Sequence, residues 1–135
     1  MKKKVLDNKY LTIYFDDEKS FMEAICNEKS KEFSDDDYRK TAMQYADTAL
    51  QYKPELILVD HTNFFYTITP SMQEWINQNI LPKLFKAGVH KLAIVKSPYI
   101  FTEISVEQII TQANSDPIKK KLFNNKDEAL QWLFE

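Results

Sequence analysis

LILVDHTNFFYTITPSMQEW, residues 56–75, is the stretch that decides the fold. It opens with four consecutive aliphatic side chains, and such a run is typical of a central strand that is covered on both faces of its sheet. Helices are therefore expected on both sides of that strand. A polar segment, residues 60–63, follows directly, and Thr69 and Pro70 then have the character of an N-cap and a first helical residue. The stretch predicts a buried strand, a loop and a helix.

Toward the N-terminus the pattern predicts a β-hairpin and then a helix. Residues 9–15, KYLTIYF, alternate between two faces and are rich in residues that favour strands. Residues 20–26 fit either a second strand, paired with the first as a hairpin, or a short helix, and we favour the strand. Ser34 and Asp37 have the spacing of a capping box, so a helix is expected to begin there and to run to about Tyr52.

Toward the C-terminus the pattern alternates between helices and strands. The helix that begins at Thr69 is expected to continue to Gly88, which closes it, and to be kinked by Pro82. Beyond it the pattern predicts, in order, a buried strand at residues 91–95, a helix at 105–113, a short strand at 119–123 and a last helix capped by Asn125.

This order of elements predicts the fold class. A chain of 135 residues has the usual size of one domain, so we expect a single domain over residues 1–135. Strands separated by helices favour parallel pairing, whereas the opening hairpin must contribute an antiparallel pair. We therefore expect an α/β fold with a mixed, mostly parallel sheet of four to five strands, an N-terminal β-hairpin and helices packed on the sheet.

The composition excludes several classes of function. Eighteen basic against twenty acidic residues give a formal net charge of -2, so nucleic acid is not an expected partner. One glycine cannot build a phosphate-binding loop, and two histidines with one cysteine cannot supply a structural zinc site, so we expect neither a cofactor nor a metal. No stretch has the length and apolar character of a signal peptide or a membrane span, and a cytoplasmic location is expected.

Four segments carry a resemblance to a known family. They are KPELILVD at residues 53–60, TPSMQEW at 69–75, AGVHKLAIV at 87–95 and LFNNKDEALQWL at 122–133. In this order they resemble the STAS domain of anti-sigma factor antagonists and sulfate transporters, and especially its short stand-alone bacterial group, the SpoIIAA-like proteins. The resemblance implies a non-enzymatic regulatory or ligand-binding domain, similar in shape to lipid-carrying CRAL-TRIO domains.

The resemblance also implies a site of phosphorylation. Anti-sigma factor antagonists of this type carry a phosphorylated serine in an Asp-Ser-Ser-Gly-like segment, at the start of the helix that follows the central strand. Here residues 68–71 read Ile-Thr-Pro-Ser, without the aspartate or the glycine. Thr69 and Ser71 are the candidate hydroxyl groups, and helix capping is the structural alternative for Thr69.

Ligands of open α/β sheets bind beyond the carboxyl ends of the strands, so two loops supply candidate contacts for a hydrophobic small molecule or a protein partner. These candidates are Asp60, His61, Asn63, Phe64, Tyr66 and Phe101. In the alternative interpretation, Asp60 and Asn63 bond to loop backbone amides and the rings seal the end of the core. A homodimer is a further candidate assembly.

Other functions remain as rival hypotheses. KPELILVD also resembles the third strand of phospho-receiver domains, with Asp60 as the phosphoacceptor and Asp16 and Asp17 as the magnesium-binding pair. A receiver requires a helix directly after Asp17, so residues 20–26 distinguish the two hypotheses. A small hydrolase or transferase is a third hypothesis. Cys26 and His61 could form a nucleophile and its base, but a buried structural cysteine is the simpler interpretation.

Overall fold

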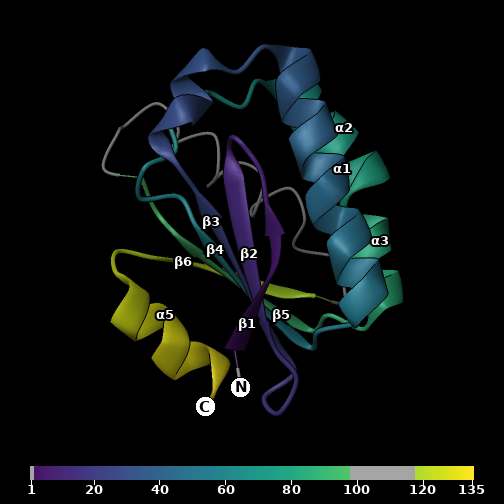
Figure 1. Ribbon diagram of the computed structural model, residues 1–135, viewed down its shortest axis with the longest axis vertical. Helices are drawn as coiled ribbons and strands as arrows, with labels where there is room; N and C mark the ends of the chain where they lie inside the picture. Colours follow the sequence, from purple (N-terminus) through teal and green to yellow (C-terminus); the bar gives the residue numbers. More distant parts are fainter. Residues whose placement is uncertain (1, 98–117) are drawn as a thin grey trace.

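One six-stranded sheet organises the described part of the chain, residues 2–97 and 118–135 of the computed structural model (Figure 1). Spatial order follows chain order: β1 (Lys2–Asp7), β2 (Leu11–Asp16), β3 (Phe21–Cys26), β4 (Leu56–Asp60), β5 (Lys91–Val95) and β6 (Lys119–Phe123). The first two pairings are antiparallel and the last three are parallel. The predicted mixed, mostly parallel sheet is confirmed, and it has six strands instead of four to five.

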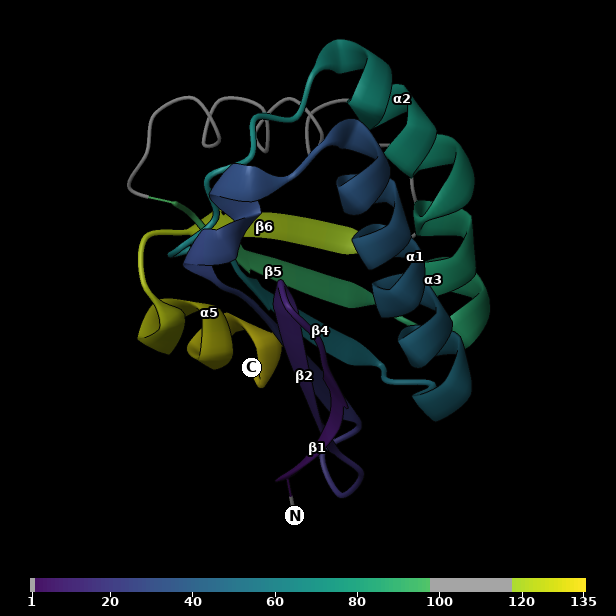
Figure 2. The same cartoon turned by 45° about the horizontal axis from the view of Figure 1, so that its top comes forward.

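Helices cover both faces of the sheet, as predicted (Figure 2). They are α1 (Asp35–Tyr52), α2 (Pro70–Asn79) and α3 (Leu81–Ala87) on one face, α5 (Lys126–Leu133) on the other, and the 3-10 helix η1 (Glu28–Glu32) between β3 and α1. The core divides into a larger cluster under α1–α3 and a smaller one under α5. Ile57 belongs to the larger cluster and Leu58 to the smaller, so β4 is apolar without interruption because both of its faces are buried.

The N-terminal hairpin is confirmed, and a strand that the sequence did not predict precedes it. Residues 21–26 form β3 and not a helix. β3 pairs with β2, from Phe21 opposite Asp16 to Cys26 opposite Leu11. The additional strand β1 pairs with β2, and its Val5 packs against the larger cluster. Its first three residues are lysines, which are unfavourable in strand interiors but suit an exposed sheet edge. The lysines at residues 119–121 lie on the opposite edge strand, β6.

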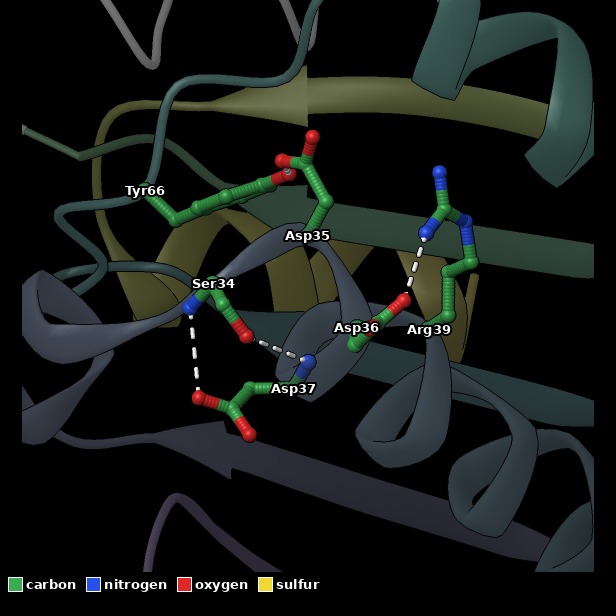
Figure 3. A network of polar contacts seen from close by, with 6 residues as sticks. All are labelled: Ser34, Asp35, Asp36, Asp37, Arg39 and Tyr66. Carbon is green, nitrogen blue, oxygen red and sulfur yellow. Dashed lines mark hydrogen bonds and ion pairs between the residues drawn. The ribbon is translucent and has the colours of Figure 1, made fainter.

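Local side-chain signals determine where α1 begins and ends. Ser34 Oγ accepts a hydrogen bond from the Asp37 N–H at 3.0 Å, and the Ser34 N–H donates to the Asp37 carboxylate at 3.2 Å (Figure 3). This is the predicted capping box. The helix ends at Lys53, which has a left-handed backbone with φ 53, and Pro54 follows.

The helix predicted from Thr69 to Gly88 is two helices, which corrects the expectation of one kinked helix. α2 and α3 are separated at Ile80, whose backbone has φ -102 and ψ -54. Pro82 lies in the first turn of α3, where its missing N–H is not required for the helix. A proline therefore starts a new helix here. Gly88 closes α3 with φ 98, as predicted.

Ion pairs attach α5 and β1 to the centre of the sheet. The Glu23 carboxylate on β3 is 1% exposed and pairs with the ammonium groups of Lys2 and Lys126. Asn125 caps α5 as predicted, because its side chain accepts from the Glu128 N–H at 2.9 Å. The helix expected at residues 105–113 lies outside the described residues. None of the helices in the described ranges is long and apolar enough to cross a membrane.

Candidate functional site

The candidate site lies where β3, β4 and β5 end. The register pairs Ile25 with Asp60, and Asp60 with Val95. Cys26 directly follows Ile25, and His61 directly follows Asp60. The two residues therefore lie at the same edge of the sheet, although 35 positions separate them in the sequence. The His61 N–H donates to the Val95 carbonyl oxygen at 3.0 Å and holds the start of the next loop against the sheet.

A cavity of about 120 Å³ lies between this face of the sheet and helices α1, α2 and α3. Aliphatic and aromatic side chains from both layers make up most of its lining, among them Ala24, Val59 and Ile94 on the strands and Ala42, Ile76 and Leu84 on the helices. The polar side chains in the lining are Cys26, Tyr38, Thr41, Tyr45, His61 and Lys120. The cavity can therefore hold an apolar body and offers few polar contacts to it.

His61 has its imidazole against the aromatic ring of Phe64. The two rings are stacked, with centroids 4.2 Å apart and an angle of 15° between their planes. The Nδ1 atom is buried and has no hydrogen-bond partner among the described residues. Burial lowers the pKa of His61 to about 4, although the neighbouring Asp60 carboxylate acts in the opposite direction. The imidazole is therefore neutral at pH 7.

Cys26 and Tyr45 complete a group of neutral polar side chains around the cavity. Burial, with a smaller contribution from the nearby Asp60 carboxylate, raises the pKa of the Cys26 thiol to about 12. Burial also raises the pKa of Tyr45, with a smaller contribution from Cys26. The Tyr45 hydroxyl is buried without a hydrogen-bond partner in the described ranges. A protonated thiol is a poor nucleophile, so the arrangement supports binding and not nucleophilic catalysis by Cys26.

Phe64 and Tyr66 are buried, and they belong to an aromatic cluster that closes this end of the core. Phe64 is 1% exposed and lines the cavity, whereas Tyr66 is 9% exposed and does not. Tyr66 stacks on Tyr38, with centroids 4.8 Å apart, and its hydroxyl donates to the Asp35 carboxylate beside the capping box of α1 (Figure 3). Burial and this hydrogen bond raise the pKa of Tyr66. The rings thus join the loop after β4 to the start of α1.

Two buried serines fix the same loop, and this role was not predicted from the sequence for either of them. Ser30 Oγ accepts from the Phe65 N–H at 2.8 Å and donates to the Asn63 carbonyl oxygen at 3.3 Å. Ser97 Oγ donates to the Phe64 carbonyl oxygen at 3.1 Å. Both serines are at most 2% exposed. An isolated serine in a sequence carries no periodicity, so its role in fixing a loop emerges only from the fold.

Asp60 and Asn63 lie outside the cavity lining. The Asp60 carboxylate accepts from the Thr62 N–H at 3.0 Å and from the Thr62 hydroxyl at 2.6 Å, which is the loop-stabilising alternative that the sequence predicted. Asn63 is exposed at the tip of the loop. Of the predicted site residues, the structure thus brings His61 and Phe64 to the cavity and places the other described ones around it.

The candidate phosphorylation sites differ in their surroundings. Thr69 Oγ accepts from the Met72 N–H at 3.2 Å and caps α2, as the structural alternative predicted. Ser71 is exposed in the first turn of that helix. Phosphorylation of either residue stays a prediction. Phe101 and the aromatic stretch around it lie outside the described residues.

The geometry contradicts the phospho-receiver hypothesis. Residues 21–26 form a strand, where a receiver requires a helix. Asp16 pairs with Phe21, and Phe21 pairs with Leu56, so Asp16 lies at the opposite end of the strands from Asp60. Four residues of strand separate these ends by about 13 Å, at roughly 3.3 Å per residue. Within the described ranges, no group of three or more His, Cys, Asp or Glu side chains could hold a metal ion.

Comparison with known proteins gives one match. The model of the SpoIIAA-like family matches residues 24–134. The matched range begins within β3, ends just after α5, and contains the whole segment that connects β4 to α2. No curated protein and no solved structure matches this chain.

Proposed function

The chain belongs to the SpoIIAA-like family of STAS domains, and we propose that it is a non-enzymatic binding domain whose cavity takes a hydrophobic small molecule. The family suggests a regulatory domain without catalytic activity. The observation that supports the ligand is the apolar cavity of about 120 Å³ under α1, α2 and α3. Empty space of this size in a core forfeits packing contacts, and a ligand would restore them.

The chemistry of the lining supports binding rather than turnover. A general acid or base works best when its pKa lies near the working pH, whereas burial moves the pKa of His61 to about 4 and that of Cys26 to about 12. Neither group changes its protonation state near pH 7. The cavity therefore offers shape and apolar contact without a group that is ready to transfer a proton.

A protein partner fits the exposed rim of the same edge. Asn63 and Ser71 are exposed there, and the loop that carries Asn63 also carries Phe64, whose ring lines the cavity. A ligand that moves Phe64 would also move this rim, because Asn63 and Phe64 are adjacent in the chain. We propose that a partner contacts the loop and thereby senses whether the cavity is filled.

Titration with benzene tests the cavity, because benzene has no polar group and is small enough for the space. Methyl resonances would be followed by NMR in protein labelled at Ile and Leu. We expect saturable shifts for Ile76 and Leu84, which line the cavity, and none for Leu58 and Leu133, which lie in the smaller cluster. Equal shifts in both clusters, or no shift in either, would remove the support for a ligand site.

A further inference from the structure

Two side chains of the cavity lining carry a buried polar atom without a hydrogen-bond partner in the described part of the chain. These are the Tyr45 hydroxyl oxygen and His61 Nδ1, and neither has a hydrogen-bond partner among residues 2–97 and 118–135. A buried polar group without a partner destabilises the folded state, so such groups in a cavity indicate a missing partner. The two side chains come from opposite layers: Tyr45 from α1, and His61 from the end of β4.

Cys26 connects these two groups in space. It lines the same cavity, it follows Ile25 at the end of the strands where His61 follows Asp60, and it is near enough to Tyr45 to contribute to that residue's raised pKa. Cys26, Tyr45 and His61 therefore all belong to the lining of one cavity, and the polar atoms of Tyr45 and His61 are buried without a partner among the described residues.

The lining favours a neutral ligand over an ionised one. Cys26, Tyr45 and His61 are uncharged at pH 7, because burial moves each pKa away from neutrality. Among the described residues, the single charged side chain in the lining is Lys120, and its ammonium donates to the Ile118 carbonyl oxygen at 3.5 Å. A carboxylate within the cavity would lose its hydration without an ion-pair partner on the helical side, which is strongly unfavourable.

Volume sets the size of the ligand. An engineered apolar cavity of about 150 Å³ is known to take benzene, and the cavity here measures about 120 Å³. The available volume matches one six-membered ring.

We propose that this cavity is a site for a small neutral ring compound with one hydroxyl group, and that Tyr45 and His61 hold the hydroxyl. A hydroxyl both donates and accepts, so it satisfies the tyrosine and either tautomer of a neutral imidazole. This inference rests on the proposed function and adds the chemical class of the ligand. Phenol is the simplest probe of that class.

The test compares phenol, benzene and benzoate on the full-length protein, with dissociation constants from NMR titration. In a purely apolar cavity phenol binds more weakly than benzene, because its hydroxyl loses hydration without compensation. With one hydrogen bond to the protein, we expect phenol to bind roughly three- to tenfold more tightly than benzene. Benzoate is expected to bind more than tenfold more weakly than phenol.

Two variants locate the effect. Tyr45→Phe removes the hydroxyl and keeps the ring, so it should reverse the preference for phenol over benzene. Tyr14→Phe is the matched control, because Tyr14 lies on the opposite face of β2 and outside the lining. His61→Phe keeps a ring against Phe64 and should also reduce the preference for phenol, which provides a second test if Tyr45→Phe does not fold.

Each outcome separates this inference from the proposed function. Benzene binding with weaker phenol binding in the wild-type protein would overturn the hydroxyl site and leave the apolar site intact. A preference for phenol that survives both Tyr45→Phe and His61→Phe, or tighter binding of benzoate, would also overturn it. Failure of both benzene and phenol to bind would remove the two proposals together.

Discussion

Replacement of Ala42 by leucine tests whether the space under α1 is empty. Ala42 lines the cavity from the middle of α1, and leucine adds three carbon atoms that would enter it. Burial of these atoms contributes about 2.4 kcal/mol, at about 0.8 kcal/mol per methylene. Fixing the leucine side chain costs roughly 0.5–1 kcal/mol. We therefore expect Ala42→Leu to raise the free energy of unfolding by about 1.5 kcal/mol.

Ala46→Leu is the matched control on the same helix. Ala46 is 0% exposed, belongs to the larger cluster and does not line the cavity. The same three carbon atoms must displace neighbours there, and overpacking of this kind costs about 1–3 kcal/mol. The two substitutions are thus chemically identical and should have opposite signs.

Urea unfolding followed by circular dichroism measures both variants. With a slope of about 1–3 kcal/mol per molar urea, the midpoint of Ala42→Leu should rise by roughly 0.5–1.5 M at an unchanged slope. The midpoint of Ala46→Leu should fall. If Ala42→Leu is destabilised as much as Ala46→Leu, the space beneath α1 is already packed and the reasoning fails.

Three further predictions concern pH, an ion pair and a helix cap. The pKa of His61 is lowered from 6.5 to about 4 in the folded state, so its contribution to stability is present above pH 6.5 and is lost, by about 3 kcal/mol, as the pH falls to 4. Urea unfolding should show no such loss in His61→Phe, and equal pH profiles of the two proteins would contradict the assignment. Lys126→Met leaves the buried Glu23 carboxylate paired with Lys2 alone. The free energy of unfolding should fall by about 1–3 kcal/mol. An unchanged free energy would show that the ion pair with Lys126 does not stabilise the fold. Ser34→Ala removes the side-chain half of the capping box and should cost about 1 kcal/mol in thermal or urea unfolding, with Ser34→Thr expected to retain most of it; equal stabilities of the two variants would argue against the cap.

The elements predicted correctly are those whose signals are local. The capping boxes and caps at Ser34, Thr69 and Asn125 each involve residues three apart, so the sequence alone determines them. The apolar run of β4 likewise reports burial on both faces. By contrast, the sequence did not predict β1, because its three lysines are not typical of a strand. Only its pairing with β2, across a turn, shows that it is one. The break at Ile80 was missed because Pro82 can either kink a helix or begin one, and local sequence does not decide between them.

Which residues come together at the cavity depends more on the register of the strands than on local sequence signals. His61 and Phe64 were predicted from the loop alone, since they follow a buried strand. Tyr45 looked like any apolar position on α1, and only the fold shows that its hydroxyl is buried without a partner in the described part of the chain. Cys26 reaches His61 because β3 and β4 pair in one particular register, and a shift of one residue would turn Cys26 to the other face.

A crystal structure determined under xenon pressure tests the binding cavity most directly, because xenon enters empty apolar cavities and scatters X-rays strongly. We predict xenon density between α1 and the sheet, within contact of Ala42, Ile76 and Phe64, in wild-type crystals and not in those of Ala42→Leu. Wild-type crystals in which that volume is filled by protein side chains and takes up no xenon would contradict the account.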